Sequence, residues 1–357
     1  KKMIYLDCCN YDHDNFFYFK TERVMKFLSK TGAVTALLSS ALIFGFSSQS
    51  IAADKIQLRL ASSGSETGTR AQAMIDVFGP AVSGVANFEP HWNSTLFKQG
   101  TEIDAIARGN LEMALASAQE LAVFFPEFSI FSAGYVHRDA EHQVAVFNDP
   151  LMDPFKAKFE DKLNLKLLAV TYFGSRHVNL RQSKAELTVM TPSALAGINL
   201  RMPGTAAWQF LGNALGATAT PLAFSEVYTS LASGAVDGQD NPIPTVVDKK
   251  FYEVTKQIVQ TGHLADLNYI AISKSVWDDM TYDQKFTVHT AAIAAAASNT
   301  QAVQDKEASL VAFVESKGLD VYTPNLASFR KQVQGKYLAS DFAKNWPKGL
   351  LEKINAL

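Results

Sequence analysis

Cysteine is almost absent from the chain: its 357 residues include two, Cys8 and Cys9, and both lie among the first ten. A disulfide framework, a cysteine-ligated zinc site and a cysteine nucleophile are therefore excluded from everything after them. Charge of one sign is also lacking, because 33 Lys and Arg residues stand against 35 Asp and Glu residues without a basic stripe. A protein that binds nucleic acid through its phosphates is not expected, and a small-molecule protein is favoured.

The sequence motifs of common enzyme classes are missing too. There is no G-x-S-x-G segment, and no G-x-G-x-x-G or Walker loop follows an expected strand, so hydrolase, dinucleotide and nucleotide sites have no support. His137 and His142 come nearest to a metal motif, but they are five residues apart and no Glu follows the first. Both zinc-protease signatures need a spacing of four. We expect these histidines to be solvated or to cap a helix, and we expect no metal and no cofactor.

One apolar run, Ala33–Phe46, stands out near the start of the chain. Basic residues precede it and small residues follow it up to Ala52, which is the pattern of a secretory signal peptide. The run is shorter than the roughly 20 residues that span a bilayer, although an uncleaved anchor is the alternative. We predict a start at Met25, a signal peptide over 25–52, and upstream sequence or an artefact over 1–24. No second apolar segment reaches membrane-spanning length, so the exported chain should be periplasmic and not membrane-spanning.

Apolar periodicity and capping residues after the signal peptide indicate an α/β fold with crossover helices. The expected strands are 56–61, 88–92, 111–116, 165–172, 198–202 and 218–222. The expected helices are 70–78, 101–108, one from 192 that ends before Gly197, one capped by Thr205 that stops near Gly216, one capped by Ser225 that stops at Gly234, and 282–317. The last of these opens with a capping box at Thr281 and would be roughly 55 Å long at about 1.5 Å per residue. A helix of that length is longer than one small domain is wide.

No flexible linker or internal repeat interrupts the chain after residue 52, yet a chain of this length usually forms two lobes. The chain should therefore cross between lobes more than once and leave a cleft, where small ligands usually bind. We assign 53–173 plus 267–306 to lobe I, and 174–266 plus 307–357 to lobe II.

Two arginines are candidates for binding a carboxylate in this cleft. Arg201 lies at the end of an expected strand beside a Pro-Gly turn, and Arg176 follows the buried run 165–172. A guanidinium offers a planar fork of donors that holds a carboxylate with two hydrogen bonds. The alternative is a pair of surface salt bridges. Asn241, in an expected turn over 238–242, could offer its amide to a ligand.

Aromatic residues near expected loops and helix starts have two interpretations. Phe224, Trp92 and Trp208 could form a pocket wall, although such residues more often belong to the core.

Three segments resemble one family. They are Leu200-Arg201-Met202-Pro203-Gly204, Gly216 to Tyr228 with its Phe224-Ser225-Glu226-Val227-Tyr228 run, and Gly234-Ala235-Val236-Asp237-Gly238-Gln239-Asp240-Asn241-Pro242. This pattern is similar to that of the DctP-type solute-binding proteins of TRAP transporters, the tripartite ATP-independent periplasmic systems. The similarity extends over about 54–340.

The resemblance implies a two-lobed periplasmic binding protein of type II-like fold, with a hinged cleft and a long helix that spans both lobes. It also implies that Arg201 holds the ligand carboxylate, that Arg176 assists, and that Asn241 and Phe224 line the site. The expected partners are an organic acid and the membrane subunits of a sodium-driven TRAP permease.

The chain departs from the family pattern beside the expected pocket. Trp92 and Lys98 lie in a segment that commonly reads Pro-Ser-Ser-Gln-Leu-Gly followed by an acid. Trp92 could narrow the pocket and Lys98 could meet a second anionic group, or both could face solvent. Ser117 stands where sialic-acid-binding members resemble one another in having Glu, which disfavours that ligand. Ser117 and the loop serine Ser63 complete the expected ligand contacts.

We therefore predict a periplasmic protein without chemistry of its own. It should capture a small carboxylate, such as a sugar acid, a hydroxy acid or a C4-dicarboxylate, and deliver it to a TRAP permease. An exported enzyme that acts on the same acids would need a general base or a metal that the sequence does not reveal. A ligand-sensing partner of a membrane receptor is the second alternative.

Overall fold

The structure is a computed structural model that describes residues 55–357. The predicted signal peptide 25–52 and the upstream segment 1–24 lie outside the described residues. Among the described residues, no helix is both long enough and apolar enough to cross a membrane.

One mixed sheet forms the centre of the described chain, with strand order β2-β1-β3-β8-β4-β7-β5-β6 and with β9 beside β8. The strands β2, β1 and β3 pair in parallel, as do β7, β5 and β6, and β9 pairs in parallel with β8. The central pairs are antiparallel: β8 pairs with β3 and with β4, and β4 pairs with β7. The strands are β1 (Ile56–Ala61), β2 (Ala86–His91), β3 (Met113–Ala116), β4 (Leu165–Leu180), β5 (Asn199–Met202), β6 (Thr218–Pro221), β7 (Gly238–Asn241), β8 (Gln257–Ser273) and β9 (Asp320–Tyr322).

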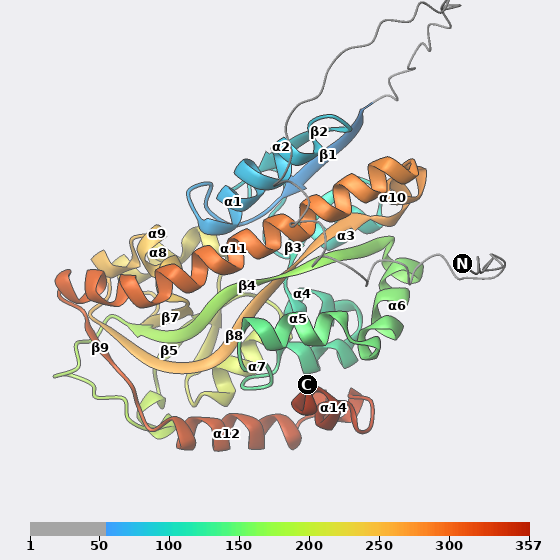
Figure 1. The fold of residues 1–357 in the computed structure, drawn as a ribbon. Helices are drawn as coiled ribbons and strands as arrows, with labels where there is room; N and C mark the ends of the chain where they lie inside the picture. Colours follow the sequence, from blue (N-terminus) through green and yellow to red (C-terminus); the bar gives the residue numbers. More distant parts are fainter. Residues whose placement is uncertain (1–54) are drawn as a thin grey trace, which may run out of the picture. The chain divides into compact units, whose positions relative to one another are not determined.

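Strands β4 and β8 are far longer than the others and pair along almost their whole length. One end of this ladder joins β3 and the other joins β7, so both strands run through the two halves of the fold (Figure 1). The ladder shifts register between Tyr172 and Gly174. A Cβ on Gly174 would lie 2.6 Å from the side chain of Pro242, and its φ of +116° also favours glycine. The lobe boundary predicted after residue 173 falls at this bulge, although the division itself stays a prediction.

Helices cover the sheet, and α11 runs along the length of the fold (Figure 1). They are α1 (Thr69–Ala73), α2 (Gly79–Val82), α3 (Glu102–Ala107), α4 (Ala118–Phe124), α5 (Ala140–Asn148), α6 (Asp153–Leu163), α7 (Ala206–Ala214), α8 (Val227–Ser233), α9 (Ile243–Asp248), α10 (Lys274–Asp279), α11 (Tyr282–Ser316), α12 (Leu326–Leu338), α13 (Asp341–Asn345) and α14 (Leu350–Ala356). The capping box predicted at Thr281 begins α11, which contacts α1 and α2 near one end and α9 and β9 near the other. The helix therefore spans both lobes.

Several sequence expectations need correction. The strand expected over 165–172 continues to Leu180, and β8 was not expected as a strand. The segment expected as a turn at 238–242 is mostly strand β7, buried throughout. The helix expected over 225–234 with Ser225 as its cap begins later, because Glu226 is the N-cap of α8.

The solvated role expected for two histidines is also wrong, because His137 and His142 are both buried. His142 instead supports the start of α5: its Nδ1 accepts a hydrogen bond from the Arg138 backbone N–H at 3.1 Å. No cluster of three metal-ligating side chains occurs within 55–357.

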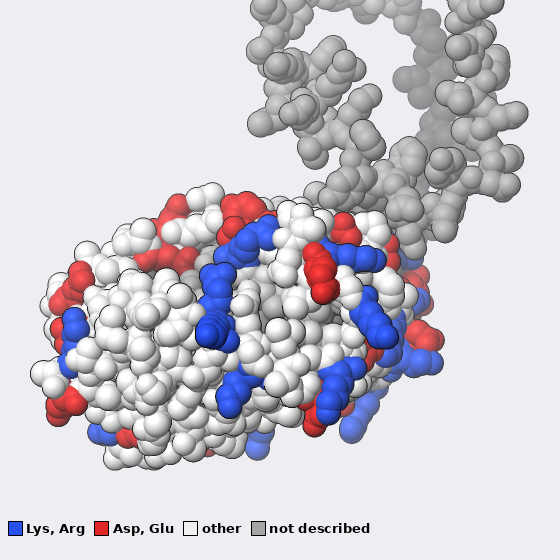
Figure 2. All heavy atoms as spheres, turned by 90° about the horizontal axis from the view of Figure 1, so that it is seen from below, with Lys and Arg blue, Asp and Glu red and all other residues white. Residues whose placement is uncertain are grey.

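On the face where α12 lies, Lys and Arg side chains alternate with Asp and Glu side chains among many uncharged residues (Figure 2). No field of a single sign covers this face, so it offers no strong long-range attraction to a charged partner.

Candidate ligand-binding site

A cavity of about 50 Å³ lies beside the point where β4 passes from one lobe to the other. Both lobes contribute to its wall: the loop after β1, the starts of α3 and α4, and strands β4, β5, β7 and β8. The lining residues are Ser62, Ser63, Arg70, Gln99, Glu102, Leu115, Ser117, Glu120, Phe173, Arg176, Arg201, Pro203, Trp208, Phe224, Asn241, Asp266 and Asn268. Most of these side chains are polar or charged, which suits a ligand with many hydrogen-bonding groups.

Arg201, on β5, is a buried cation without a carboxylate partner among the described residues. Its Nε and Nη2 donate to the backbone oxygen of Leu222 at 2.9 and 2.7 Å, and Nη2 lies 3.5 Å from Gln99 Oε1. Nη1 has no hydrogen-bond partner in residues 55–357, and it is not completely buried. Because Arg201 lines the cavity, we infer that Nη1 is exposed to it. Burial lowers the pKa of Arg201 to about 9, which reflects a charge that lacks a close counter-ion. An anionic ligand would supply that counter-ion.

Arg176 is equally buried, but its charge is compensated by two acids. Its Nε donates to Asp240 Oδ2 at 2.8 Å, and its Nη1 donates to Asp266 Oδ2 at 2.7 Å. Burial alone would raise the pKa of Asp240, but the attraction of Arg176 and the hydrogen bond from His263 outweigh it and hold that pKa at about 2. The Arg176 guanidinium also stacks 4.4 Å from the ring centre of Trp208. Arg176 is therefore fixed in place before any ligand arrives.

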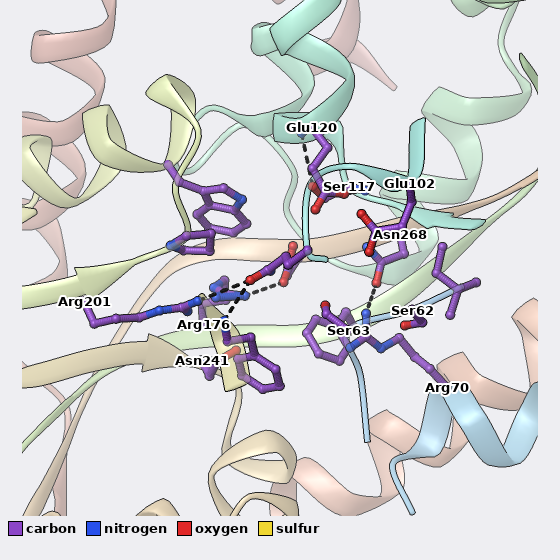
Figure 3. Close-up of a pocket in the computed structure, with 17 residues that line it drawn as sticks. Ser62, Ser63, Arg70, Glu102, Ser117, Glu120, Arg176, Arg201, Asn241 and Asn268 are labelled. Atoms are coloured by element: carbon purple, nitrogen blue, oxygen red, sulfur yellow. Dashed lines mark hydrogen bonds and ion pairs between the residues drawn. The ribbon is translucent and has the colours of Figure 1, made fainter. Parts of the chain in front are cut away.

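The opposite side of the cavity carries a different set of charges. Figure 3 places Arg201 on one side of the cavity and Glu102 and Asn268 on the other. Burial and the nearby Glu120 raise the pKa of Glu102 to about 8. Arg70 contacts Asn268 Oδ1 through Nη1 and lies 3.7 Å from the ring centre of Phe173. One side of the cavity thus offers a free cation, and the other offers a mixture of carboxylates, an amide and a guanidinium.

Comparison with known proteins agrees with this geometry. The family model described as bacterial extracellular solute-binding protein, family 7 (DctP), matches residues 59–344. The chain belongs to this family. It is a TRAP-type solute-binding protein with the two-lobed fold, as the sequence resemblance predicted.

Individual relatives differ in the ligand that they bind. A TRAP periplasmic solute-binding protein from Roseobacter denitrificans, solved with bound 3-deoxy-D-manno-oct-2-ulosonic acid (KDO), is 62% identical and has a TM-score of 0.84, with 85% of this chain and 99% of that chain covered. The sialic acid-binding periplasmic protein of Vibrio cholerae is 27% identical, over 83% of this chain and 90% of its own. The 2,3-diketo-L-gulonate-binding periplasmic protein of Escherichia coli is 25% identical, over 90% of this chain and 96% of its own.

Six of the eight ligand contacts expected for this family 7 protein line the cavity. They are Arg201, Arg176, Asn241, Phe224, Ser63 and Ser117. Asn241 donates from Nδ2 to Gln239 Oε1 at 2.5 Å, while its Oδ1 has no partner within the described chain and is left for the ligand. Ser117 Oγ accepts from the Glu120 N–H at 3.2 Å as the cap of α4, and the Ser117 hydroxyl also interacts with the Glu120 carboxylate, which partly offsets the rise in the pKa of Glu120 caused by burial.

Trp92 and Lys98 are not among the residues that line this cavity. Trp92 is buried and lines a second cavity of about 220 Å³, which shares Arg70, Phe173 and Phe224 with the first. Lys98 is exposed. Its neighbour Gln99 faces the ligand cavity instead, where Gln99 Oε1 accepts from the Phe224 N–H at 3.0 Å.

Arg70, Glu102 and Glu120 line the cavity but were not recognised from sequence. The sequence pattern places Arg70 only at the start of a helix, and the acids lie in the first turns of short helices. A charged residue in a first turn is ordinary in any helix. The available signal was the loop serine pair before Arg70, which marks the carboxyl end of a strand where ligands often bind.

Proposed function

We propose that this protein captures a monocarboxylic sugar acid of the KDO type and delivers it to a TRAP permease. The observation that carries this proposal is Arg201, a buried cation that faces the cavity with no carboxylate partner in the described chain. The bound KDO in the 62% identical structure supports the same ligand class. The many polar groups opposite Arg201 suit the hydroxyl groups of a sugar.

In the proposed complex the ligand carboxylate lies against Arg201. Leu222 accepts from Nε and Nη2, so Nη1 is the free donor for one carboxylate oxygen, and the second carboxylate oxygen would take the place of Gln99 Oε1, which lies 3.5 Å from Nη2. Arg176 is bound to its aspartates and adds charge and orientation from beside the ligand. Asn241, Ser63 and Ser117 contact hydroxyl oxygens, and Phe224 covers the bound sugar.

The protein should release its ligand unchanged. Membership of a family of solute-binding proteins supports this. The family is described as extracellular, and several curated relatives are named as periplasmic proteins, which supports export through the predicted signal peptide. The membrane subunits of a sodium-driven TRAP permease are the proposed partners.

Calorimetric titration of the purified protein with KDO tests the proposal. We expect saturable binding of one ligand per chain and recovery of the ligand unaltered. Ligand at about 100 times its Kd should stabilise the fold by about 2.7 kcal/mol, which a thermal melt detects. Sialic acid, D-galactonate and L-malate serve as comparison ligands. Absence of binding and of a thermal shift with KDO would contradict the proposed ligand.

A further inference from the structure

The cavity beside Arg201 is small for the ligand that we propose. Its volume is about 50 Å³. A cavity of about 150 Å³ holds a single benzene ring, so a third of that volume has room for a carboxylate and little more. Most of the carbon chain of KDO therefore has to lie outside this cavity.

A second cavity of about 220 Å³ adjoins the first. Arg70, Phe173 and Phe224 line both cavities, and the Arg70 guanidinium carbon lies 3.7 Å from the ring centre of Phe173. Arg70 lies across the first cavity from Arg201 (Figure 3). A carbon chain whose carboxylate is bound at Arg201 therefore reaches the second cavity after it crosses the first.

The wall of the second cavity suits a polyhydroxy chain. Trp92 is only 6% exposed and, together with Phe173 and Phe224, gives this cavity aromatic walls. Thr69 and the buried Thr245 also line it, and neither hydroxyl group has a hydrogen-bond partner in residues 55–357. Ligand sites typically combine aromatic surface with a few polar groups that fix the orientation of the ligand. A threonine hydroxyl can both donate to and accept from a ligand hydroxyl.

Helix α11 contributes Lys306 and Leu310 to the wall of the second cavity. These two residues are four positions apart, so they share one face of the helix. Ala308 lies between them in the sequence but is exposed and does not line the cavity. The helix therefore offers one position that borders the cavity and one nearby position that does not, which makes a matched pair for substitution.

We infer that the second cavity is a subsite for the carbon chain of the ligand, and that it makes this protein prefer polyhydroxy acids with more than six carbons. Trp92, Thr245 and Leu310 are the residues of this subsite that determine the preference. The inference rests on the proposed function, because it places the ligand carboxylate at Arg201. A shorter acid bound at Arg201 leaves much of the second cavity to water and makes fewer contacts with its walls.

Two 3-deoxy-2-oxo acids with the same carboxylate end test the subsite: KDO has eight carbons, and 2-keto-3-deoxy-D-gluconate has six. Calorimetry at pH 7 gives the affinity of the parent protein for each acid. We expect KDO to bind at least tenfold more tightly, and we call this quotient the chain-length ratio. A chain-length ratio below ten in the parent protein would overturn the inference.

Leu310→Trp should fill part of the second cavity and lower the chain-length ratio at least threefold, because the longer acid depends more on that space. Ala308→Trp adds the same side chain to the exposed face of α11 and should keep the ratio within twofold of the parent value. Each ratio compares two ligands on one variant, so a loss of stability that affects both ligands alike cancels. A decrease of less than threefold in Leu310→Trp, or an equal decrease in Ala308→Trp, would overturn the inference.

Thr245 gives a second test that adds no bulk. Thr245→Val removes the hydroxyl group and should lower the chain-length ratio about threefold, whereas Thr245→Ser keeps the hydroxyl group and should preserve the ratio. The Val variant should melt no lower than the parent protein without ligand, because no hydrogen bond within residues 55–357 is lost. Equal ratios in the Val and Ser variants would contradict the role assigned to Thr245.

Failure of the proposed ligand would be seen separately. A parent protein that binds KDO and the six-carbon acid equally well retains the proposed function and contradicts the inference. If KDO does not bind, the chain-length ratio is measured with D-glycero-D-gulo-heptonate and D-gulonate, which are aldonic acids of seven and six carbons. A ratio of at least ten then supports the inference, and a lower ratio overturns it. A protein that binds none of these acids contradicts both the proposed function and the inference.

Discussion

Replacing Arg201 with methionine should stabilise the ligand-free protein and remove tight binding at the same time. Burial lowers the pKa of Arg201 from 12.5 to about 9, a difference that corresponds to roughly 5 kcal/mol at about 1.36 kcal/mol per pH unit. The substitution also removes the hydrogen bonds to Leu222, which offsets part of the gain in stability, at about 1.5–3 kcal/mol for a hydrogen bond from a charged group. We expect a net gain of about 2–3.5 kcal/mol, or about 4–14 °C in Tm at about 2–4 °C per kcal/mol.

The effect on binding has the opposite sign. Removing one partner of a buried charge pair costs on the order of 2–5 kcal/mol, which weakens affinity by about thirtyfold or more. Calorimetry with KDO measures this loss, and thermal melts without ligand measure the gain in stability. Arg201→Lys is the informative companion: it keeps the charge, so it should bring little stability, but it loses the fork and should still weaken binding at least tenfold.

These two readouts decide whether Arg201 serves the ligand or the fold. A structural arginine would give a lower melting temperature on replacement and an affinity that falls only in proportion to stability. Arg201→Met that melts several degrees below the parent protein, or that binds KDO as the parent does, would refute the assignment of Arg201 as the carboxylate-binding residue.

Five further outcomes follow from the same geometry. Arg176→Ala should lower the ligand-free stability by about 3–5 kcal/mol, measured by denaturant unfolding, because two buried aspartates lose their partner. The folded protein binds the Glu102 proton more tightly than the unfolded chain, so stability should fall as pH rises from about 5 to 8, and Glu102→Gln should flatten that part of the pH profile. Lys98→Ala should leave KDO affinity within about twofold by calorimetry, since its side chain is exposed. Ligand binding should close the cleft and reduce the radius of gyration measured by X-ray scattering. Thr67 Oγ1 donates a hydrogen bond of 2.6 Å to Asp248 Oδ1, which joins the two lobes. Thr67→Val removes this hydrogen bond and should weaken ligand affinity by about threefold to tenfold.

The sequence predicted the elements whose pattern is local. Strand β1 and helix α11 lie where alternation and the capping box placed them, because a strand edge and a helix start depend on a few neighbouring residues. Arg201 and Arg176 could be proposed as ligand contacts because a strand that ends at a cleft directs its last side chains toward it. In the structure both line one cavity.

The second half of β4 could not be recognised in the same way. Its residues after Gly174 include several polar side chains, which in a sequence resemble a loop. Inside the protein Asn179 donates to the backbone oxygen of Gln257 at 2.9 Å and accepts from Gln239 at 3.0 Å, so the buried polar groups are satisfied by strands 60 and 78 residues away. Glu102 and Glu120 escaped notice for the same reason, because only the folded chain brings them to the cavity that holds Arg201.

The chain passes between the lobes three times, through β4, β8 and α11. These passages also determine how the protein responds to proteolysis and to truncation. A protease that cuts one passage would leave the lobes joined covalently by the other two and by the hydrogen bonds between β4 and β8. Neither lobe can be produced alone as a complete unit, because β4 and β8 pair along the sheet in both halves. A fragment that ended at the bulge near Gly174 would expose unpaired strand edges, which are templates for aggregation. The same three passages therefore make the two lobes inseparable during folding.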